Sequence, residues 1–146
     1  MALSTFQNYW GPIWPLGFIG VANNGTPVNI MHTVDPSNNN APWTPTTYGG
    51  VVAETSPACH KIFMQGLHPG SNNNGMIVNT GMVYVLRTAG GGTANRSDSG
   101  AMVAIIYPGG STTFPAAESE LNTLSPYDLL LDSDVDGEGC LVTLMR

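Results

Sequence analysis

Residues 127–145 of the sequence read YDLLLDSDVDGEGCLVTLM. Two apolar runs of strand length, Tyr127–Leu131 and Cys140–Met145, flank the acidic segment Asp132–Gly139. Aspartate and glycine are favoured in tight turns, because aspartate hydrogen-bonds locally and glycine tolerates a left-handed backbone. The stretch therefore predicts two strands joined by an acidic hairpin turn that is exposed to solvent.

Further short strand-like runs, separated by turn residues, lie upstream of this stretch. Residues 26–34 alternate as in a half-buried strand, with Val28 and Ile30 on the apolar side. The other runs are Cys59–Met64, Met76–Val78, Met82–Leu86 and Ala101–Tyr107, with a short candidate at Val51–Ala53. Seven or eight short strands with a turn about every ten residues indicate an all-β fold. We expect an antiparallel β-sandwich of jelly-roll type over residues 23–146.

The first 22 residues differ from the rest, because they are rich in aromatic residues and contain Pro12 and Pro15. Each proline removes a backbone donor and biases its predecessor away from the α region, so an extended N-terminal arm is expected. Exposed tryptophan and tyrosine side chains often anchor protein contacts. The residues predicted to contact a neighbouring protein or another subunit are Phe6, Tyr9, Trp10, Trp14 and Phe18. Packing of these rings on the domain's own core is an equally good reading.

Composition narrows the classes of function. The chain has 146 residues, of which only 10% are charged, and its formal net charge is −6. Four Lys and Arg residues cannot form the basic surface that nucleic acid requires. The apolar stretch Ile13–Val21 is short and contains a proline, so neither a signal peptide nor a membrane span is expected. Cys59 and Cys140 have no metal-type spacing and are expected to be buried free thiols, although a disulfide between them is possible.

The acidic segment contains residues of the type that bind metal ions. Asp132, Asp134 and Asp136 match the first half of an EF-hand calcium loop, D-x-D-x-D-G. The twelfth position, which should hold a bidentate Glu, is Thr143, and flanking helices are missing, so an EF-hand is excluded. A weaker calcium site at the turn is kept as an alternative hypothesis. The favoured interpretation is a solvated turn that binds no metal.

No catalytic motif stands out in the sequence. Cys59 and His60 are neighbours in a predicted strand, so their side chains point to opposite faces and cannot act as a nucleophile and its base. His32 is expected in the core or an interface, and His68 in a loop. Glu54, Glu118 and Glu120 are the carboxylates outside the acidic segment that a glycosidase would need. No feature of the sequence singles out any of these glutamates as catalytic. An enzyme that uses Glu118 or the aspartates of the acidic segment is therefore the weakest hypothesis. We expect no enzyme and no cofactor.

Four segments in the second half of the chain carry a family resemblance. They are Ile77–Val85 (IVNTGMVYV), Ile106–Ser111 (IYPGGS), Tyr127–Asp134 (YDLLLDSD) and Gly137–Val142 (GEGCLV). Their order resembles that in capsid decoration (cement) proteins and related minor head proteins of tailed bacteriophages. The resemblance covers residues 76–145, and Leu86 and Arg87 depart from the small residue expected there.

This resemblance implies a virion protein that binds the outside of a phage capsid and bridges capsomers without catalysis. It implies the major capsid protein as partner, a homotrimer at threefold positions, and synthesis in the host cytoplasm. The alternative from the residues is a carbohydrate-binding module of a virion fibre or cell surface. Trp43 would then stack on a sugar, because it lies in a proline-containing loop. Neither function involves nucleic acid or a membrane.

Overall fold

A computed structural model describes residues 13–31, 59–71, 75–88, 93–115 and 126–145. These residues form strands joined by turns and by short 3₁₀ turns such as η2 at Pro126–Asp128. The strands are β1 (Ile13–Gly20), β2 (Val28–Asn29), β3 (Lys61–Gln65), β4 (Leu67–Pro69), β5 (Met76–Val78), β6 (Val83–Arg87), β7 (Met102–Ile106), β8 (Ser111–Pro115), β9 (Leu129–Ser133) and β10 (Gly139–Met145). The predicted all-β class is confirmed.

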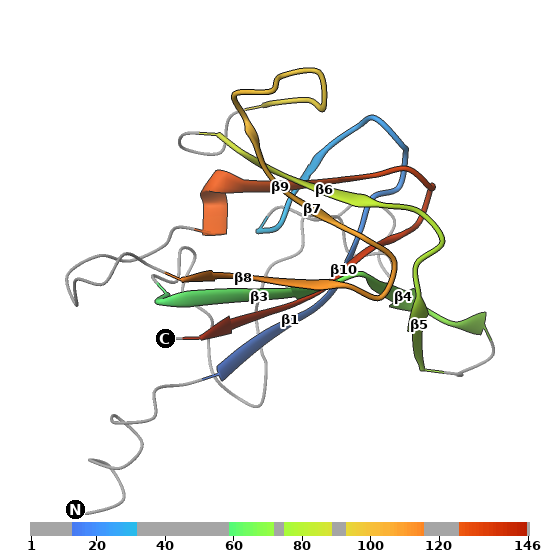
Figure 1. Cartoon of the computed structure of the whole chain (residues 1–146). Coiled ribbons are helices and arrows are strands. Elements are labelled where there is room, and N and C mark those ends of the chain that lie inside the picture. The colour runs from blue at the N-terminus through green and yellow to red at the C-terminus, as the bar shows by residue number, and fades with distance from the viewer. Residues whose placement is uncertain (1–12, 32–58, 72–74, 89–92, 116–125, 146) are drawn as a thin grey trace, which may run out of the picture.

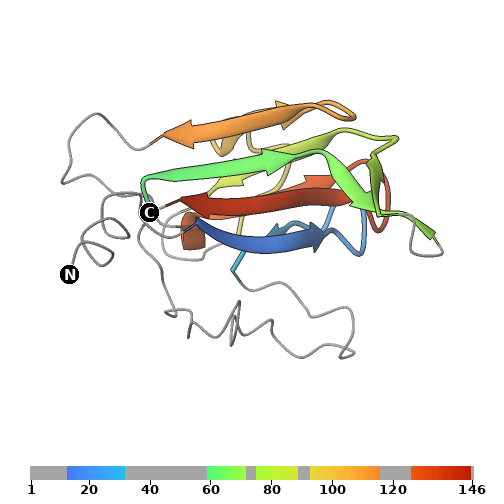
Figure 2. The ribbon, with the colours of Figure 1, turned by 90° about the horizontal axis from the view of Figure 1, so that it is seen from below.

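Eight of the strands form two antiparallel four-stranded sheets that lie one above the other (Figures 1 and 2). Sheet A has the order β1-β10-β3-β8, and sheet B has the order β2-β9-β6-β7. The pairing is nested, because β1 pairs with β10, β2 with β9, β3 with β8, and β6 with β7. The chain therefore runs like one long hairpin that is folded over into two layers.

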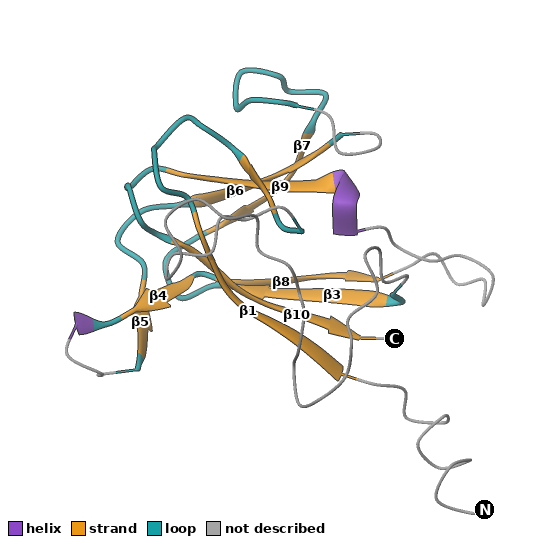
Figure 3. Cartoon of the chain, turned by 180° about the vertical axis from the view of Figure 1, so that it is seen from behind, coloured by secondary structure: helices purple, strands orange, loops and turns teal. Residues whose placement is uncertain are grey.

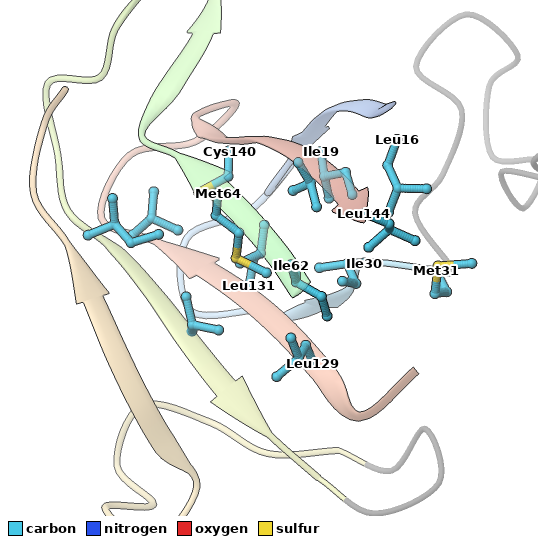
Figure 4. Close-up of a cluster of buried hydrophobic side chains, with 14 of the residues drawn as sticks. Leu16, Ile19, Ile30, Met31, Ile62, Met64, Leu129, Leu131, Cys140 and Leu144 are labelled. Carbon is cyan, nitrogen blue, oxygen red and sulfur yellow. The ribbon is translucent and has the colours of Figure 1, made fainter. Parts of the chain in front are cut away.

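The core fills the space between the two sheets (Figure 4). Along β3 and β10 buried and partly exposed residues alternate, as expected for a strand with one face in the core. Ile62, Leu131 and Val142 are fully buried. Burying a large aliphatic side chain stabilises a fold by roughly 1.5–3 kcal/mol, so this interlayer cluster is the main source of stability. The other buried members are Leu16, Ile19, Val21, Ile30, Met31, Cys59, Met64, Val83, Val85, Ile106, Leu129, Cys140 and Leu144.

The segment from Ile13 to Gly20 lies in the sandwich instead of projecting from it as an arm. It is edge strand β1 of sheet A, paired with β10 from Ile13 opposite Met145 to Gly20 opposite Gly139. An edge strand tolerates Pro15, and the register shifts between Pro15 and Gly17, where Gly17 has φ 82°. Residues 1–12 lie outside the described residues.

The acidic segment does not close a hairpin. Strand β9 belongs to sheet B and β10 to sheet A, so residues 134–138 connect the two layers. The expectation of a hairpin was therefore wrong, whereas residues 135–137 are exposed as expected. Apolar runs of strand length cannot by themselves distinguish two strands that pair from two strands that face each other across a core, because both arrangements bury apolar side chains.

Other strands also differ from the sequence expectation. Strand β2 is short: Asn29 and Ile30 are both buried, and Asn29 Oδ1 accepts a hydrogen bond from the amide of Met31 at 2.9 Å. This local bond turns the backbone where the alternating pattern predicted a longer strand. Strands β4 and β8 were not expected. Strand β4 pairs with β5 in a small hairpin that stands beside the two layers (Figure 3).

Candidate functional site

The acidic connection between the sheets is held by Arg96, from the loop between β6 and β7. Arg96 Nε lies 2.8 Å from Asp132 Oδ2, and Arg96 Nη1 lies 2.7 Å from Asp134 Oδ1. The guanidinium also lies 4.8 Å from the centre of the Tyr84 ring, whose hydroxyl donates to Asp134 Oδ1 at 3.1 Å. Asp132 is completely buried, so its charge needs this partner.

The turn between β1 and β2 completes this group. The amide of Gly25 donates to Asp132 Oδ1 at 2.9 Å, and Asn24 Nδ2 donates to the carbonyl oxygen of Asp134 at 2.7 Å. Arg96 Nη2 donates to Asn24 Oδ1. We call the five residues Asn24, Tyr84, Arg96, Asp132 and Asp134 the Arg96 cluster. It joins three loops that are far apart in the sequence.

These contacts bear on the calcium hypothesis. Asp132 and Asp134 face Arg96, and Asp136 Oδ1 accepts a hydrogen bond from the amide of Asn24 at 2.7 Å. A bound guanidinium already neutralises the carboxylates that a cation would need. Within the described part of the chain, no group of three His, Cys, Asp or Glu side chains is placed to hold a metal ion. The geometry therefore gives the acidic segment a structural role.

Glu138, at the end of the same segment, occupies a second buried position. Its carboxylate accepts hydrogen bonds from the amide of Thr80 at 2.7 Å, the hydroxyl of Thr80 at 2.8 Å, and the amide of Gly81 at 2.9 Å. His68 Nδ1 lies 3.8 Å from Glu138 Oε1. Burial raises the pKa of Glu138, but these hydrogen bonds and the charge of His68 outweigh it, so the net pKa is lowered. Glu138 is therefore an ionised anchor for the turn after β5.

His68 has partners that the sequence did not reveal. Besides Glu138, its Nδ1 lies 3.1 Å from Asn79 Oδ1, and Asn79 Nδ2 donates to the carbonyl oxygen of Gly139 at 2.7 Å. Glu138 follows His68 by 70 positions, so no local pattern could have paired them. Asn79 is buried and, with Glu138, fixes the base of the β4–β5 hairpin to β10.

The two cysteines are buried and are not joined by a disulfide. Burial raises the pKa of Cys59 to about 11 and that of Cys140 to about 12, which disfavours the reactive thiolate. His60 is exposed, whereas Cys59 is buried, so the two neighbours do point to opposite faces.

Apolar side chains are exposed on one small hairpin. In β5, Met76, Ile77 and Val78 are 36%, 42% and 54% exposed. Val78 lies against the turn between β7 and β8, because a Cβ added to Gly109 would lie 3.3 Å from its Cγ1. Tyr107, at the start of that turn, is 65% exposed. We call Met76, Ile77, Val78 and Tyr107 the apolar hairpin surface. Three consecutive exposed apolar residues are unusual on a strand.

A second apolar row follows the outer side of β7. Val103 and Ile105 are each 44% exposed, and they alternate with Ala104 and Ile106, which face the core. Tyr107, which belongs to the apolar hairpin surface, follows this row directly along the chain. Strand β7 pairs with β6 on one side and is the edge of sheet B on the other. We call Val103, Ile105 and this strand side, which pairs with no other described strand, the β7 edge.

The structure places few of the contact residues predicted from the sequence. Phe18 is partly buried on β1, where its ring lies over Gly20, and Trp14 is described only as part of that strand's backbone. The candidate residues of any kind that lie outside the described residues are Phe6, Tyr9, Trp10, His32, Trp43, Glu54, Glu118 and Glu120. Sequence reasoning missed the apolar hairpin surface, whose signal was the uncharged apolar run at 76–78 beside a loop.

Comparison with known proteins gives no further identification. No family model, no curated protein and no solved structure matches this chain. In the described portion, no helix is long and apolar enough to span a membrane.

Proposed function

We propose that this chain is a structural protein of a bacteriophage virion that binds the outside of the capsid, bridges neighbouring capsomers and acts without catalysis. The partner is the major capsid protein, and the bound form is a homotrimer on the capsid surface. The proposal rests on the resemblance of residues 76–145 to capsid decoration proteins and on the exposed surfaces of the fold.

The strand connectivity supports this proposal. We interpret the nested pairing of two four-stranded sheets as that of a double-sheet jelly roll, as expected from the sequence. Jelly rolls are common in viral capsid and lectin domains. The architecture is therefore compatible with both candidate functions, and the choice between them depends on the surface.

The apolar hairpin surface is the single observation that carries the proposal. An isolated two-stranded hairpin is only marginally stable in water, and this one is held at its base by Asn79 and Glu138. Because the hairpin is anchored, Ile77 and Val78 point outward from a backbone that is already ordered. Little conformational entropy is therefore lost when a partner binds these side chains. Exposed apolar groups on a rigid support favour contact with protein over contact with a sugar hydroxyl array.

Co-sedimentation with purified expanded capsids tests the proposal. The wild-type protein should pellet with capsids at a saturable stoichiometry. Ile77→Ser/Val78→Ser removes the apolar groups from exposed positions, so the fold is retained and the affinity is expected to fall about tenfold or more. Val135→Ser is the matched control, because Val135 is 37% exposed on the connection between β9 and β10.

Two results would overturn the proposal. One is a wild-type protein that stays in the supernatant with capsids at every concentration. The other is saturable binding that both variants share, which would move the contact away from the hairpin. A further variant lacking residues 1–12 tests the aromatic arm; the deletion stops there because residues 13–20 form β1.

The carbohydrate-binding alternative predicts a different pattern. The wild-type protein would bind immobilised glycans, Trp43→Ala would abolish that binding, and Ile77→Ser/Val78→Ser would leave it unchanged. Lectins use the same architecture, which is the observation in favour of this alternative.

A further inference from the structure

The turn between β1 and β2 contains an asparagine followed by a glycine, Asn24-Gly25, at exposed positions. Asparagine before glycine deamidates readily, because glycine has no Cβ to shield its backbone nitrogen. In that reaction the Gly25 nitrogen attacks Cγ of Asn24, the bond from Cγ to Nδ2 breaks, and ammonia leaves with the proton of the Gly25 amide. Water then opens the five-membered ring at either carbonyl group and leaves aspartate or isoaspartate. Water is the only co-reactant, so an exposed turn has everything that the reaction needs.

The conformation of the turn holds the reacting atoms apart. The amide of Thr26 donates to the carbonyl oxygen of Asn23 at 3.0 Å, and Gly25 has φ 80°. A four-residue turn with a positive φ at its third residue is of type II or type I′, and in both types the ψ angle of Asn24 is positive. The ring forms only at a negative ψ, where the Gly25 nitrogen and Cβ of Asn24 lie on the same side of the Cα–C bond. Asn24 must therefore leave the turn conformation before it can react.

The Arg96 cluster opposes that movement through both ends of the Asn24 side chain. Arg96 Nη2 donates to Asn24 Oδ1, and Asn24 Nδ2 donates to the carbonyl oxygen of Asp134 at 2.7 Å. The attacking nitrogen is also engaged, because the amide of Gly25 donates to Asp132 Oδ1 at 2.9 Å. Asp132 is completely buried, so a rotation of ψ at Asn24 would take one donor away from a buried carboxylate, which costs free energy. The leaving group, the electrophile and the nucleophile of the reaction are therefore all held by the same contacts.

We propose that Asn24 is a deamidation site that the Arg96 cluster keeps closed, so that aspartate or isoaspartate forms there when the cluster opens. The product does not restore the original contacts, because an oxygen replaces the Nδ2 donor opposite the carbonyl oxygen of Asp134. Its new carboxylate also adds to those of Asp132, Asp134 and Asp136 beside the Arg96 guanidinium. The reaction therefore records an opening of this turn permanently. This inference goes beyond the proposed function, and its test contains no capsid, so either can fail alone.

Incubation of the full chain at mildly alkaline pH, with and without urea, measures the protection. Peptide mapping by mass spectrometry quantifies aspartate and isoaspartate at position 24, and cleavage at Lys61 separates this position from the other Asn-Gly pair, Asn74-Gly75. Several hydrogen bonds must break before the folded chain reacts, so it should convert Asn24 about 100-fold more slowly than the chain in urea. Arg96→Met removes the donor to Asn24 Oδ1 and should raise the rate in the folded protein about tenfold.

Control variants separate opening of the cluster from loss of overall stability, and urea unfolding shows that each variant is folded. Ile62→Ala leaves a cavity in the core and lowers overall stability, but it should convert Asn24 almost as slowly as the wild type. Arg87→Met, at an exposed position on β6, should do the same. Arg96→Lys keeps a charge beside Asp132 without the planar fork, so it should act like Arg96→Met and replaces it if that variant does not fold. A wild-type protein that reacts equally fast with and without urea overturns the proposal, and so does a folded Arg96 variant that reacts no faster than Ile62→Ala.

Discussion

At the scale of single residues, Arg96 determines how the acidic connection is held. Its guanidinium forms ion pairs with the carboxylates of Asp132 and Asp134, and Asp132 is completely buried. Burial lowers the pKa of Arg96, but the charge of Asp132 and contacts with Tyr84 and Asp134 outweigh it, so the net pKa is raised. The same contacts that keep Arg96 charged keep the buried carboxylate paired.

Arg96→Met should therefore destabilise the fold by about 3 kcal/mol. Removing one partner of a buried pair costs roughly 3–5 kcal/mol, and the low end applies because about a quarter of the Arg96 side chain is exposed to screening solvent. Urea denaturation at neutral pH measures this loss. Arg87→Met, at an exposed position on β6, is the control and should change little. Equal stabilities of the two variants would contradict a structural role for the Arg96 cluster.

Glu138 should make stability depend on pH in a defined direction. Its folded pKa is lowered, so its contribution is fully present above the unfolded value of about 4.3. The contribution is lost as the pH falls from there through the folded pKa, because the unfolded carboxyl takes up a proton first. The difference in free energy of unfolding between wild type and Glu138→Gln should therefore shrink below about pH 4. Urea titrations from pH 7 to pH 3 test this, and a pH-independent difference would refute it.

At the scale of elements, the close approach of β1 to β10 depends on Gly139. A Cβ at this position would lie 2.0 Å from the carbonyl oxygen of Ile19, which is backbone and cannot rotate away. Gly139→Ala should force the two strands apart and cost about 3 kcal/mol, the upper part of the usual range for overpacking. Gly100→Ala is the control, because its Cβ would meet an Asp98 oxygen at an ordinary 3.4 Å. Equal unfolding midpoints for the two variants would show that β1 does not pair as described.

At the scale of the whole molecule, both thiols report on the integrity of the sandwich. Cys59 and Cys140 are buried in the core cluster and have pKa values raised to about 11 and about 12. The folded protein should therefore react with a thiol reagent only through global opening, and two thiols should titrate rapidly in denaturant. Rapid modification of either cysteine under native conditions would contradict the closed packing between the sheets.

Much of the fold was predictable because strand periodicity is local. The apolar runs Cys59–Met64, Met82–Leu86 and Ala101–Tyr107 predicted strands that the structure contains as β3, β6 and β7, each within one or two residues. The capsid and sugar contacts proposed from Trp10 and Trp43 stay predictions. The apolar run at 76–78 was visible in the sequence, but its exposure could not be predicted, since the exposure of Ile77 depends on which segments cover it.

The sequence by itself determined the all-β class, the positions of most strands, the low charge and the absence of a catalytic motif. Only the tertiary structure decided that residues 13–20 are a strand, that β9 and β10 lie in different sheets, and that Arg96 meets Asp132. The physical reason is distance along the chain. Alternation and turn chemistry act over a few residues, whereas Gly20 meets Gly139, and Thr80 meets Glu138 across 58 positions, only after the sheets have packed.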